Sequence, residues 1–324
     1  MLLREVNKLT NSQKGMLAGF TGNFIFGLSF LFSSTAFATA SLSLDGKDVI
    51  SGADVPVVLA IRFVFAFLLM SAIIPLFKIK LSFKGKPVWK LILLGLFQPV
   101  IYFVVESFGL KMTGIVISSV MLALVPIVCQ FFSAVFLKDC PNFMQIFFSI
   151  ISVAGVISIT IISSEDTGAK TYISGIICLV VAVVSAAAFN VLGRSISDVF
   201  TPYERTYFMF IVSAVFFLLY ALFAVKFDFS LIAAPFASPS FIISILYLGG
   251  LSSVVAYFMI NYANTYLPIT RATIFSNVIT VVSTAAGFLA GEKFRLSTVI
   301  CCIIIVFGIC GVQRFAESKK VDKN

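Results

Sequence analysis

Ten apolar stretches, separated by short polar segments, make up almost the whole chain. The hydrocarbon core of a bilayer is about 30 Å thick, and a helix needs about 20 apolar residues to cross it. Because hydrocarbon offers the backbone no hydrogen-bond partner, stretches this apolar must be helical. We therefore predict an all-α polytopic membrane protein with ten transmembrane helices. The stretches cover residues 15–40, 55–77, 88–110, 115–137, 143–162, 172–192, 203–225, 241–262, 269–290 and 297–315.

Composition narrows the classes of function. Hydrophobic residues form 60% of the chain and charged residues 11%, whereas a soluble domain carries about 25% charged residues. The chain has no histidine, and its six cysteines lack the spacing of metal ligands. The net charge of +9 lies mostly in the loops. We expect a protein surrounded by lipid bilayer that is not an enzyme and has no catalytic residue, metal site, cofactor or nucleic-acid partner.

The basic residues predict the orientation in the membrane. If the N-terminus is cytoplasmic, the cytoplasmic segments carry 16 of the 23 Lys and Arg residues and the outer segments carry 6, with Arg62 inside a span. Cytoplasmic loops of membrane proteins carry such an excess. The first apolar stretch is too long for a cleaved signal peptide. We predict a multi-pass protein of the cell membrane with both termini in the cytoplasm.

Part of the second half repeats the first half at an offset of 155 residues. A unit of five helices enters the membrane on one side and leaves on the other, so its copy must be inverted. Inverted repeats are typical of secondary transporters, whose substrate site lies near the midplane between the halves. The matching pairs are Gly95 with Gly250, Leu96 with Leu251, Val100 with Val255, Tyr102 with Tyr257 and Phe103 with Phe258.

Three further features carry a family resemblance. They are the pair Arg62 and Phe63, the small-residue stretch 109–126 (GLKMTGIVISSVMLALVP), and residues 289–292 (LAGE). In this order across ten spans they resemble the EamA-type family of the drug/metabolite transporter superfamily. The chain departs from the family pattern at residues 137–139, which read Leu-Lys-Asp instead of Gly-Glu, and at Thr280, where proline is usual.

The resemblance covers residues 15–315 and implies a fold and a function. The fold would be two inverted five-helix repeats, residues 15–163 and 172–316, around a central cavity. Cytoplasmic segments 1–14 and 317–324 would flank them. The implied function is export of amino acids or similar metabolites. The resemblance also places the first and sixth helices, with Asn23 and Asn190, at the cavity.

Two ionisable residues lie clearly within predicted spans, Arg62 and Glu106. A charge in hydrocarbon is costly and marks a functional site by default. At about 1.5 Å per residue, both lie about 8–12 Å below the outer surface on neighbouring helices. They could contact the substrate or form only a structural pair with each other. Each could also extend its charged end to the outer interface.

Two polar stripes at matching positions are typical of a cavity lining. Gln98, Tyr102 and Glu106 follow the spacing i, i+4, i+8 on one helix face. Ser253, Tyr257 and Asn261 hold the same positions in the second half, at the offset of 155 residues. Pro99 is expected to kink this helix and free a carbonyl group. Polar contact between helices is the alternative explanation of the stripes. The candidate substrate-binding residues are Arg62, Gln98, Tyr102, Glu106, Asn23, Asn190, Ser253, Tyr257 and Asn261.

The sequence favours a secondary transporter of small polar metabolites that works by alternating access. Arg62 would suit a carboxylate and Glu106 an ammonium group, so a zwitterion fits the pair. Glu106 is also the candidate group for coupling to protons. The chain has no GxxxxGK[ST] loop, so it would not hydrolyse ATP to drive transport.

Three alternatives are open. A sugar-phosphate or nucleotide-sugar carrier would require more than one buried cation, and Arg62 is the cation that the spans offer. An intramembrane enzyme would require a nucleophile and base, or a metal. A non-transporting scaffold would not need two polar stripes at repeat-related positions.

The charge bias leads to a direct prediction. Cysteines placed at Lys47 and Lys170 should react with a membrane-impermeant thiol reagent added outside intact cells, and a cysteine at Lys84 should not. The reason is that Lys84 lies in the strongly basic segment assigned to the cytoplasm. Labelling of position 84 from outside would contradict the predicted orientation.

Overall fold

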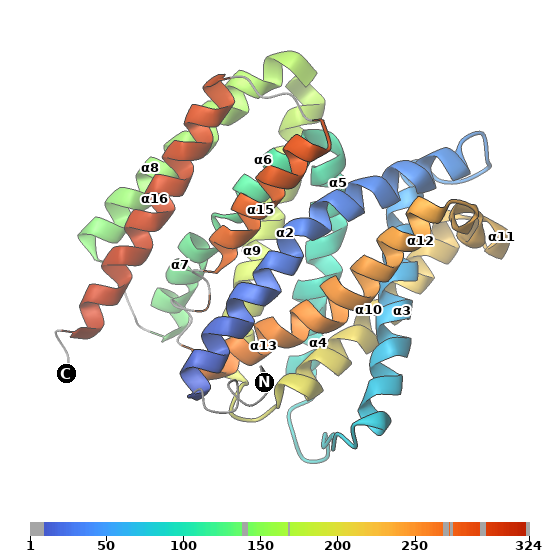
Figure 1. Cartoon of the computed structure of the whole chain (residues 1–324), viewed down its shortest axis with the longest axis horizontal. Helices are drawn as coiled ribbons and strands as arrows, with labels where there is room; N and C mark the ends of the chain where they lie inside the picture. The colour runs from blue at the N-terminus through green and yellow to red at the C-terminus, as the bar shows by residue number, and fades with distance from the viewer. Residues whose placement is uncertain are drawn as a thin grey trace, which may run out of the picture.

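The computed structural model describes residues 10–137, 142–167, 169–267, 272, 275–291 and 296–321. Within these ranges all regular structure is helical and no strand occurs (Figure 1). The helices of the first half are α2 (Asn11–Leu44), α3 (Asp54–Leu76), α4 (Trp89–Gly95), η1 (Leu96–Ile101), α5 (Tyr102–Thr113), α6 (Ile115–Leu122), α7 (Val125–Leu137) and α8 (Phe143–Thr167). Those of the second half are α9 (Ala169–Ser195), α10 (Pro202–Ala224), α11 (Phe229–Ala233), η2 (Ala234–Ala237), α12 (Pro239–Ile245), η3 (Leu246–Ala256), α13 (Tyr257–Tyr266), α15 (Ser276–Leu289) and α16 (Leu296–Val321).

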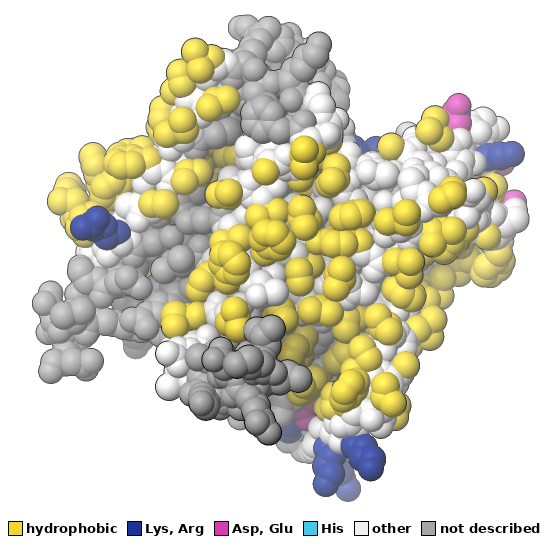
Figure 2. Space-filling view, viewed as in Figure 1, with side chains coloured by type: hydrophobic (Ala, Val, Ile, Leu, Met, Phe, Trp, Pro, Cys, Tyr) yellow, Lys and Arg dark blue, Asp and Glu magenta, His cyan; other side chains and the backbone are white. Residues whose placement is uncertain are grey.

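Within the part of the chain that the structure describes, seven helical stretches are long and apolar enough to cross a membrane. Three shorter apolar helices fall in the remaining predicted stretches. Figure 2 shows apolar side chains spread over the visible face of the helices, with Lys and Arg toward its edges. The prediction of an all-helical, multi-pass membrane protein is confirmed. The long stretches are Asn11–Leu44, Asp54–Leu76, Trp89–Thr113, Ile115–Phe136, Tyr172–Ser195, Pro202–Ala224 and Pro239–Tyr266; the shorter ones are Phe143–Gly155, Val278–Gly287 and Val299–Gly308.

Local sequence signals begin and end several helices. Thr10 and Thr201 cap α2 and α10 in reciprocal capping boxes with the glutamine or glutamate three residues later. The helices α3 and α10 end alike, each with a lysine in the left-handed conformation. At these ends the N–H of Ile79 donates to the carbonyl of Ile74, and that of Phe227 to the carbonyl of Leu222. Such bonds satisfy carbonyls that the helix end leaves unpaired.

Two spans contain π-helical segments, η1 and η3. The first includes Gln98, whose φ of −145° and ψ of 120° interrupt the helix before Pro99. The peptide bond between these two residues is cis. The expected distortion at Pro99 is thus present, since proline removes one helical hydrogen bond. The second segment, Leu246–Ala256, widens a helix that has no proline at the corresponding position.

Helices of the two halves pack against each other throughout. The principal pairs are α3 with α10, α8 with α16, α5 with α9, and α2 with both α13 and α15. Glycines permit one of these close approaches, because a β-carbon at Gly109 or Gly175 would lie 2.7 Å from a side chain of the facing helix. The start of α2, the end of α16 and the α3–α4 connection all lie toward the lower side of Figure 1. The interior between these pairs holds the polar residues of the next section.

Candidate functional site

A cavity of about 70 Å³ lies among helices of both halves. Its walls come from α2, η1, α5, α6 and α7 of the first half, and from α9, α13, Ala272 and α15 of the second. Most of its surface is apolar, with polar groups spread over several helices, as is usual in small-molecule sites. Among the described residues, no charged side chain lines it. The polar lining residues are Asn23, Gln98, Tyr102, Asn190, Tyr257, Asn264 and Ser276.

Five of the nine predicted site residues therefore line one cavity. They are Asn23, Gln98, Tyr102, Asn190 and Tyr257, drawn from five elements of the fold. The structure brings Tyr102 and Tyr257 together, as their matching positions at an offset of 155 residues suggest. The remaining four residues, Arg62, Glu106, Ser253 and Asn261, lie outside the lining.

The asparagines of the cavity are held by their own helices. The side chains of Asn23 and Asn190 each donate to a backbone carbonyl one turn earlier, Gly19 at 2.6 Å and Ala186 at 2.9 Å. Asn264 donates to the side-chain oxygen of Asn190 at 3.0 Å, which links α13 to α9. Among the described residues, the amide oxygens of Asn23 and Asn264 receive no hydrogen bond. They are the acceptors that the cavity offers to a ligand.

The interrupted third span brings Gln98 to the cavity. Because the backbone leaves the helical conformation at Gln98, its side chain is not tied to the preceding helical turn. Gln98 is buried and lies near the hydroxyl of Tyr257, although the two groups form no hydrogen bond of normal geometry. A polar ligand group could therefore bind both without first breaking a strong internal bond.

Arg62 is fully buried and binds the opposite half of the molecule. Its Nε donates to the hydroxyl of Ser253 at 3.0 Å, and one Nη donates to that of Ser252 at 3.0 Å. The guanidinium also lies over the ring of Phe103, 4.3 Å from its centroid. Hydrogen bonds and a cation–π contact replace the water that the charge would have outside the bundle. Arg62 thus joins α3 to η3.

Glu106 is buried on α5 but forms no ion pair with Arg62. Among the described residues the ion pairs within 4.0 Å are Lys86 with Glu204, Lys111 with Asp54, and Lys226 with Asp48. Glu106 still lies close enough to Arg62 for their opposite charges to attract through the interior. The two charges share one region of the bundle without direct contact.

A series of aromatic contacts connects the cavity with Arg62. Tyr257 is fully buried, and its ring centroid lies 5.1 Å from that of Phe26 and 6.3 Å from those of Phe103 and Phe189. The Arg62 guanidinium lies over the ring of Phe103. Tyr257 and Phe103 therefore connect the cavity with Arg62 by successive contacts. Among the described residues, the cavity thus presents rings and amides, and Arg62 lies behind two of these rings.

Ser253 and Asn261 lie apart from Tyr257 for two different reasons. Ser253 lies four residues before Tyr257, in the π-helical segment η3. Because a π-helix has a wider turn than an α-helix, Ser253 falls on a different helix face from Tyr257. Asn261 faces α10, because its side chain donates to the Thr206 hydroxyl at 2.9 Å and its carbonyl accepts from Arg205 at 2.7 Å. The regular i, i+4, i+8 stripe therefore does not describe this span.

Arg205 corrects the count of buried charges. The charge count assigned it to the cytoplasmic side, at the edge of the predicted stretch 203–225, but it lies in the first turns of α10 and is fully buried. Its guanidinium donates to the carbonyls of Gly193 and Asn261 at 2.8 and 2.7 Å. The carbonyl ends of α9 and α13 attract a cation because they carry partial negative charge. Arg205 thus fastens the ends of two cavity helices.

Sequence reasoning missed Asn264 and Ser276. Ile260 and Asn264, which lie three and seven residues after Tyr257, both line the cavity. The i, i+3, i+7 spacing of these residues is an ordinary helical stripe that could have been found. Ser276 follows a segment of which the structure describes only a few residues, and no sequence pattern marked it.

Comparisons with known proteins agree with this architecture. The model of the EamA-like transporter family matches residues 13–161 and 173–314. An uncharacterised transporter, YcxC, of Bacillus subtilis (strain 168) is 30% identical over 298 residues, which cover 90% of this chain and 91% of the relative. An uncharacterised transporter of Archaeoglobus fulgidus is 29% identical over 264 residues, which cover 80% of this chain and 89% of the relative.

A solved structure has the same fold. It is described as "Crystal structure of protein", aligns with a TM-score of 0.62 at 18% sequence identity, and the match covers 93% of this chain and 97% of that one. The family match extends over both halves. The chain belongs to the EamA-like transporter family.

The cavity lining leads to a prediction about one helix. In a background without native cysteines, Asn264→Cys should react with a small water-soluble thiol reagent much faster than Ser253→Cys. Asn264 lines the cavity, whereas Ser253 is buried against Arg62. The measurement is the labelling rate in detergent at matched protein amounts. Equal rates at the two positions would contradict the assigned cavity face.

Proposed function

We propose that this member of the family is a secondary transporter that moves a small polar metabolite across the cell membrane by alternating access. The observation that carries the proposal is the amide- and tyrosine-lined cavity between the halves. The bundle would comprise ten crossings in two inverted five-helix repeats, with both termini in the cytoplasm. The proposal assigns no chemical reaction to the chain.

The packing of the helices supports the inverted repeat. The repeat pairs α2 with α9, α3 with α10, and the span ending in α5 with the span ending in α13. If the members of each pair are exchanged, the contact between α2 and α13 becomes a contact between α9 and α5, and the contact between α3 and α10 maps onto itself. The helices α2 and α13, α9 and α5, and α3 and α10 do pack together. The π-helical segments η1 and η3 also lie at corresponding positions.

The helix ends give independent support. Lys78 and Lys226 occupy the same place after α3 and α10, each with a φ of 51°. Each end also has the same backbone hydrogen bond spanning five residues. This shared lysine geometry and hydrogen bond are expected of a duplicated unit, and transporters built from such units bind substrate between them.

The lining favours a substrate with neutral hydrogen-bonding groups on the part that occupies the cavity. Asn23, Gln98 and Asn264 can donate and accept, and the tyrosines add hydroxyl groups and ring faces. Amino acids and similar metabolites carry such groups beside their charges. A substrate with two or more phosphate charges would find no cation among the described lining residues.

The aromatic contacts suggest how the charges take part. We assign Tyr257 and Phe103 to a gate that moves between the two access states. Opening it would expose Arg62 to a carboxylate and Glu106 to an ammonium group or a proton. Binding energy then differs between the two states, which is the condition for a ligand to shift a conformational equilibrium.

Arg205 does not favour the sugar-phosphate alternative, although it adds a second buried cation. Two of its nitrogens already bind the carbonyls of Gly193 and Asn261. Recruiting it to a phosphate would release the ends of α9 and α13. An intramembrane enzyme gains no support either, since among the described residues no group of three or more His, Cys, Asp or Glu side chains could hold a metal.

Exchange of labelled amino acids by the protein in liposomes tests the function. Gln98→Leu should reduce the initial exchange rate by roughly tenfold, because an unmatched polar group in a buried site costs about 1–3 kcal/mol. Gln130→Leu makes the same change on α7, away from the cavity lining, and should retain the rate. Equal rates in both variants would contradict the cavity as the substrate site, and no exchange by the unmodified protein would reject this substrate class.

Proton coupling has its own test at Glu106. Glu106→Gln preserves the shape of the side chain and removes its ability to release a proton. We expect the variant to exchange substrate at equal pH on both sides but to show no acceleration when a pH gradient is applied. Unchanged acceleration in the variant would exclude Glu106 as the coupling group.

A further inference from the structure

An apolar groove of about 410 Å³ lies where α3 ends, α10 begins and η3 joins α13. Its walls include Ile73, Phe77, Val255 and Phe258, and no lining residue is charged. The groove shares no lining residue with the central cavity. Its volume falls within the range of about 300–1,000 Å³ typical of small-molecule sites. The lining suits a hydrocarbon chain.

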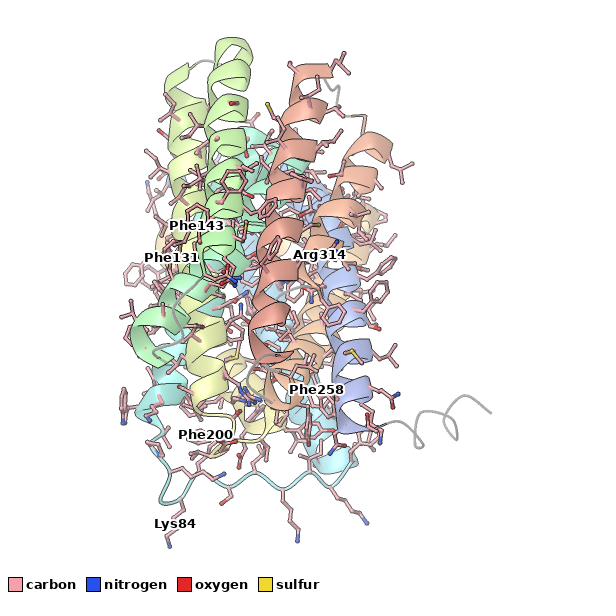
Figure 3. The ribbon with its side chains drawn as sticks, turned by 90° about the vertical axis from the view of Figure 1, so that its left-hand side faces the viewer. Lys84, Phe131, Phe143, Phe200, Phe258 and Arg314 are labelled. Atoms are coloured by element: carbon pink, nitrogen blue, oxygen red, sulfur yellow. The ribbon has the colours of Figure 1, made fainter. Side chains whose placement is uncertain are left out.

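A strongly basic segment begins at the rim of this groove. Residues 77–90 contain five lysines and no acidic residue. Lys78 lies between the groove residues Phe77 and Ile79, and Lys80 follows directly. Figure 3 shows Phe258 toward the same end of the bundle as Lys84, whose side chain points away from the helices. Positive charge therefore lies beside the groove at an end of the bundle.

The lysines of this segment differ in their partners. Lys86 binds the carboxylate of Glu204 at 2.9 Å. Lys78 and Lys80 are exposed, and neither forms an ion pair with any described residue. Lys226, which holds the corresponding place at the end of α10, is paired with Asp48. Lys78 thus has the same backbone geometry as Lys226 without its acidic partner.

We infer that the groove, together with Lys78 and Lys80, binds an anionic glycerophospholipid of the surrounding membrane. One acyl chain lies along Ile73, Val255 and Phe258, and the headgroup phosphate binds the two lysines. Hydrocarbon burial supplies affinity for any phospholipid. The lysines supply the preference for negative charge, since basic residues at the membrane surface attract anionic lipids. Tyr203, with its ring 4.5 Å from that of Phe258, gives the groove an aromatic wall of the kind found at membrane interfaces.

Native mass spectrometry of the purified full chain tests this inference. The protein is titrated with phosphatidylglycerol and with phosphatidylcholine of the same acyl chains. We expect tighter binding of phosphatidylglycerol. The double variant Lys78→Gln/Lys80→Gln should weaken that binding by about fivefold for each lysine. It should weaken phosphatidylcholine binding less, because the positive choline group offsets the charge of the phosphate in that lipid. The control Lys47→Gln/Lys84→Gln removes the same charge at lysines that do not adjoin a lining residue in the sequence, and it should bind as the unmodified protein does.

A second variant tests the groove without changing any charge. Val255→Trp fills the groove with a large ring and should weaken binding of both phospholipids by at least about threefold, because it displaces buried methylene groups. Equal affinity of the unmodified protein for the two phospholipids would overturn the anionic preference. Equal losses in the lysine variant and its control would overturn the assignment to Lys78 and Lys80. Unchanged binding in Val255→Trp would overturn the groove itself.

Discussion

In a membrane, the N–H and C=O groups of the backbone must form hydrogen bonds within the protein. Where the helices of this structure are irregular, some of these groups lose their regular helical partner, and the surrounding protein must accommodate them. The irregular positions are Gln98 and the π-helical segments η1 and η3. All three lie on the two spans that meet at the centre of the bundle. Such departures are tolerated where protein or a cavity, instead of lipid, surrounds the backbone. The cavity and the irregular spans therefore occur together.

The buried charges depend on the same arrangement. Arg62 reaches two adjacent hydroxyls, Ser252 and Ser253, on the π-helical segment of the opposite half. Arg205 binds carbonyl groups at the ends of two helices. Neither guanidinium forms an ion pair with a carboxylate among the described residues, and each donates hydrogen bonds to neutral groups. Movement between the halves would change the contacts of Arg62, whereas those of Arg205 lie within the second half.

The sequence predicted the helical class and seven long spans, because these depend on composition. Tyr102 and Tyr257, which match at an offset of 155 residues, line one cavity. The sequence predicted the cavity faces less well. A regular helical stripe grouped Ser253 with Tyr257, but the wider turn of η3 turns Ser253 toward Arg62. Asn264 lay within reach of pattern analysis, since it shares the i, i+3, i+7 face with Tyr257. The burial of Arg205 was not predictable from its loop-like position, because it depends on carbonyl groups that only the folded bundle brings together.

Alternating exposure of the cavity is the central claim, and Gln98 is the best position to test it. With native cysteines removed, Gln98→Cys can be labelled by a membrane-impermeant thiol reagent in right-side-out and in inside-out vesicles. The account predicts reaction from both sides, with substrate changing the two rates in opposite directions as it shifts the populations of the access states. Reaction from one side alone, with or without substrate, would contradict alternating access through this cavity.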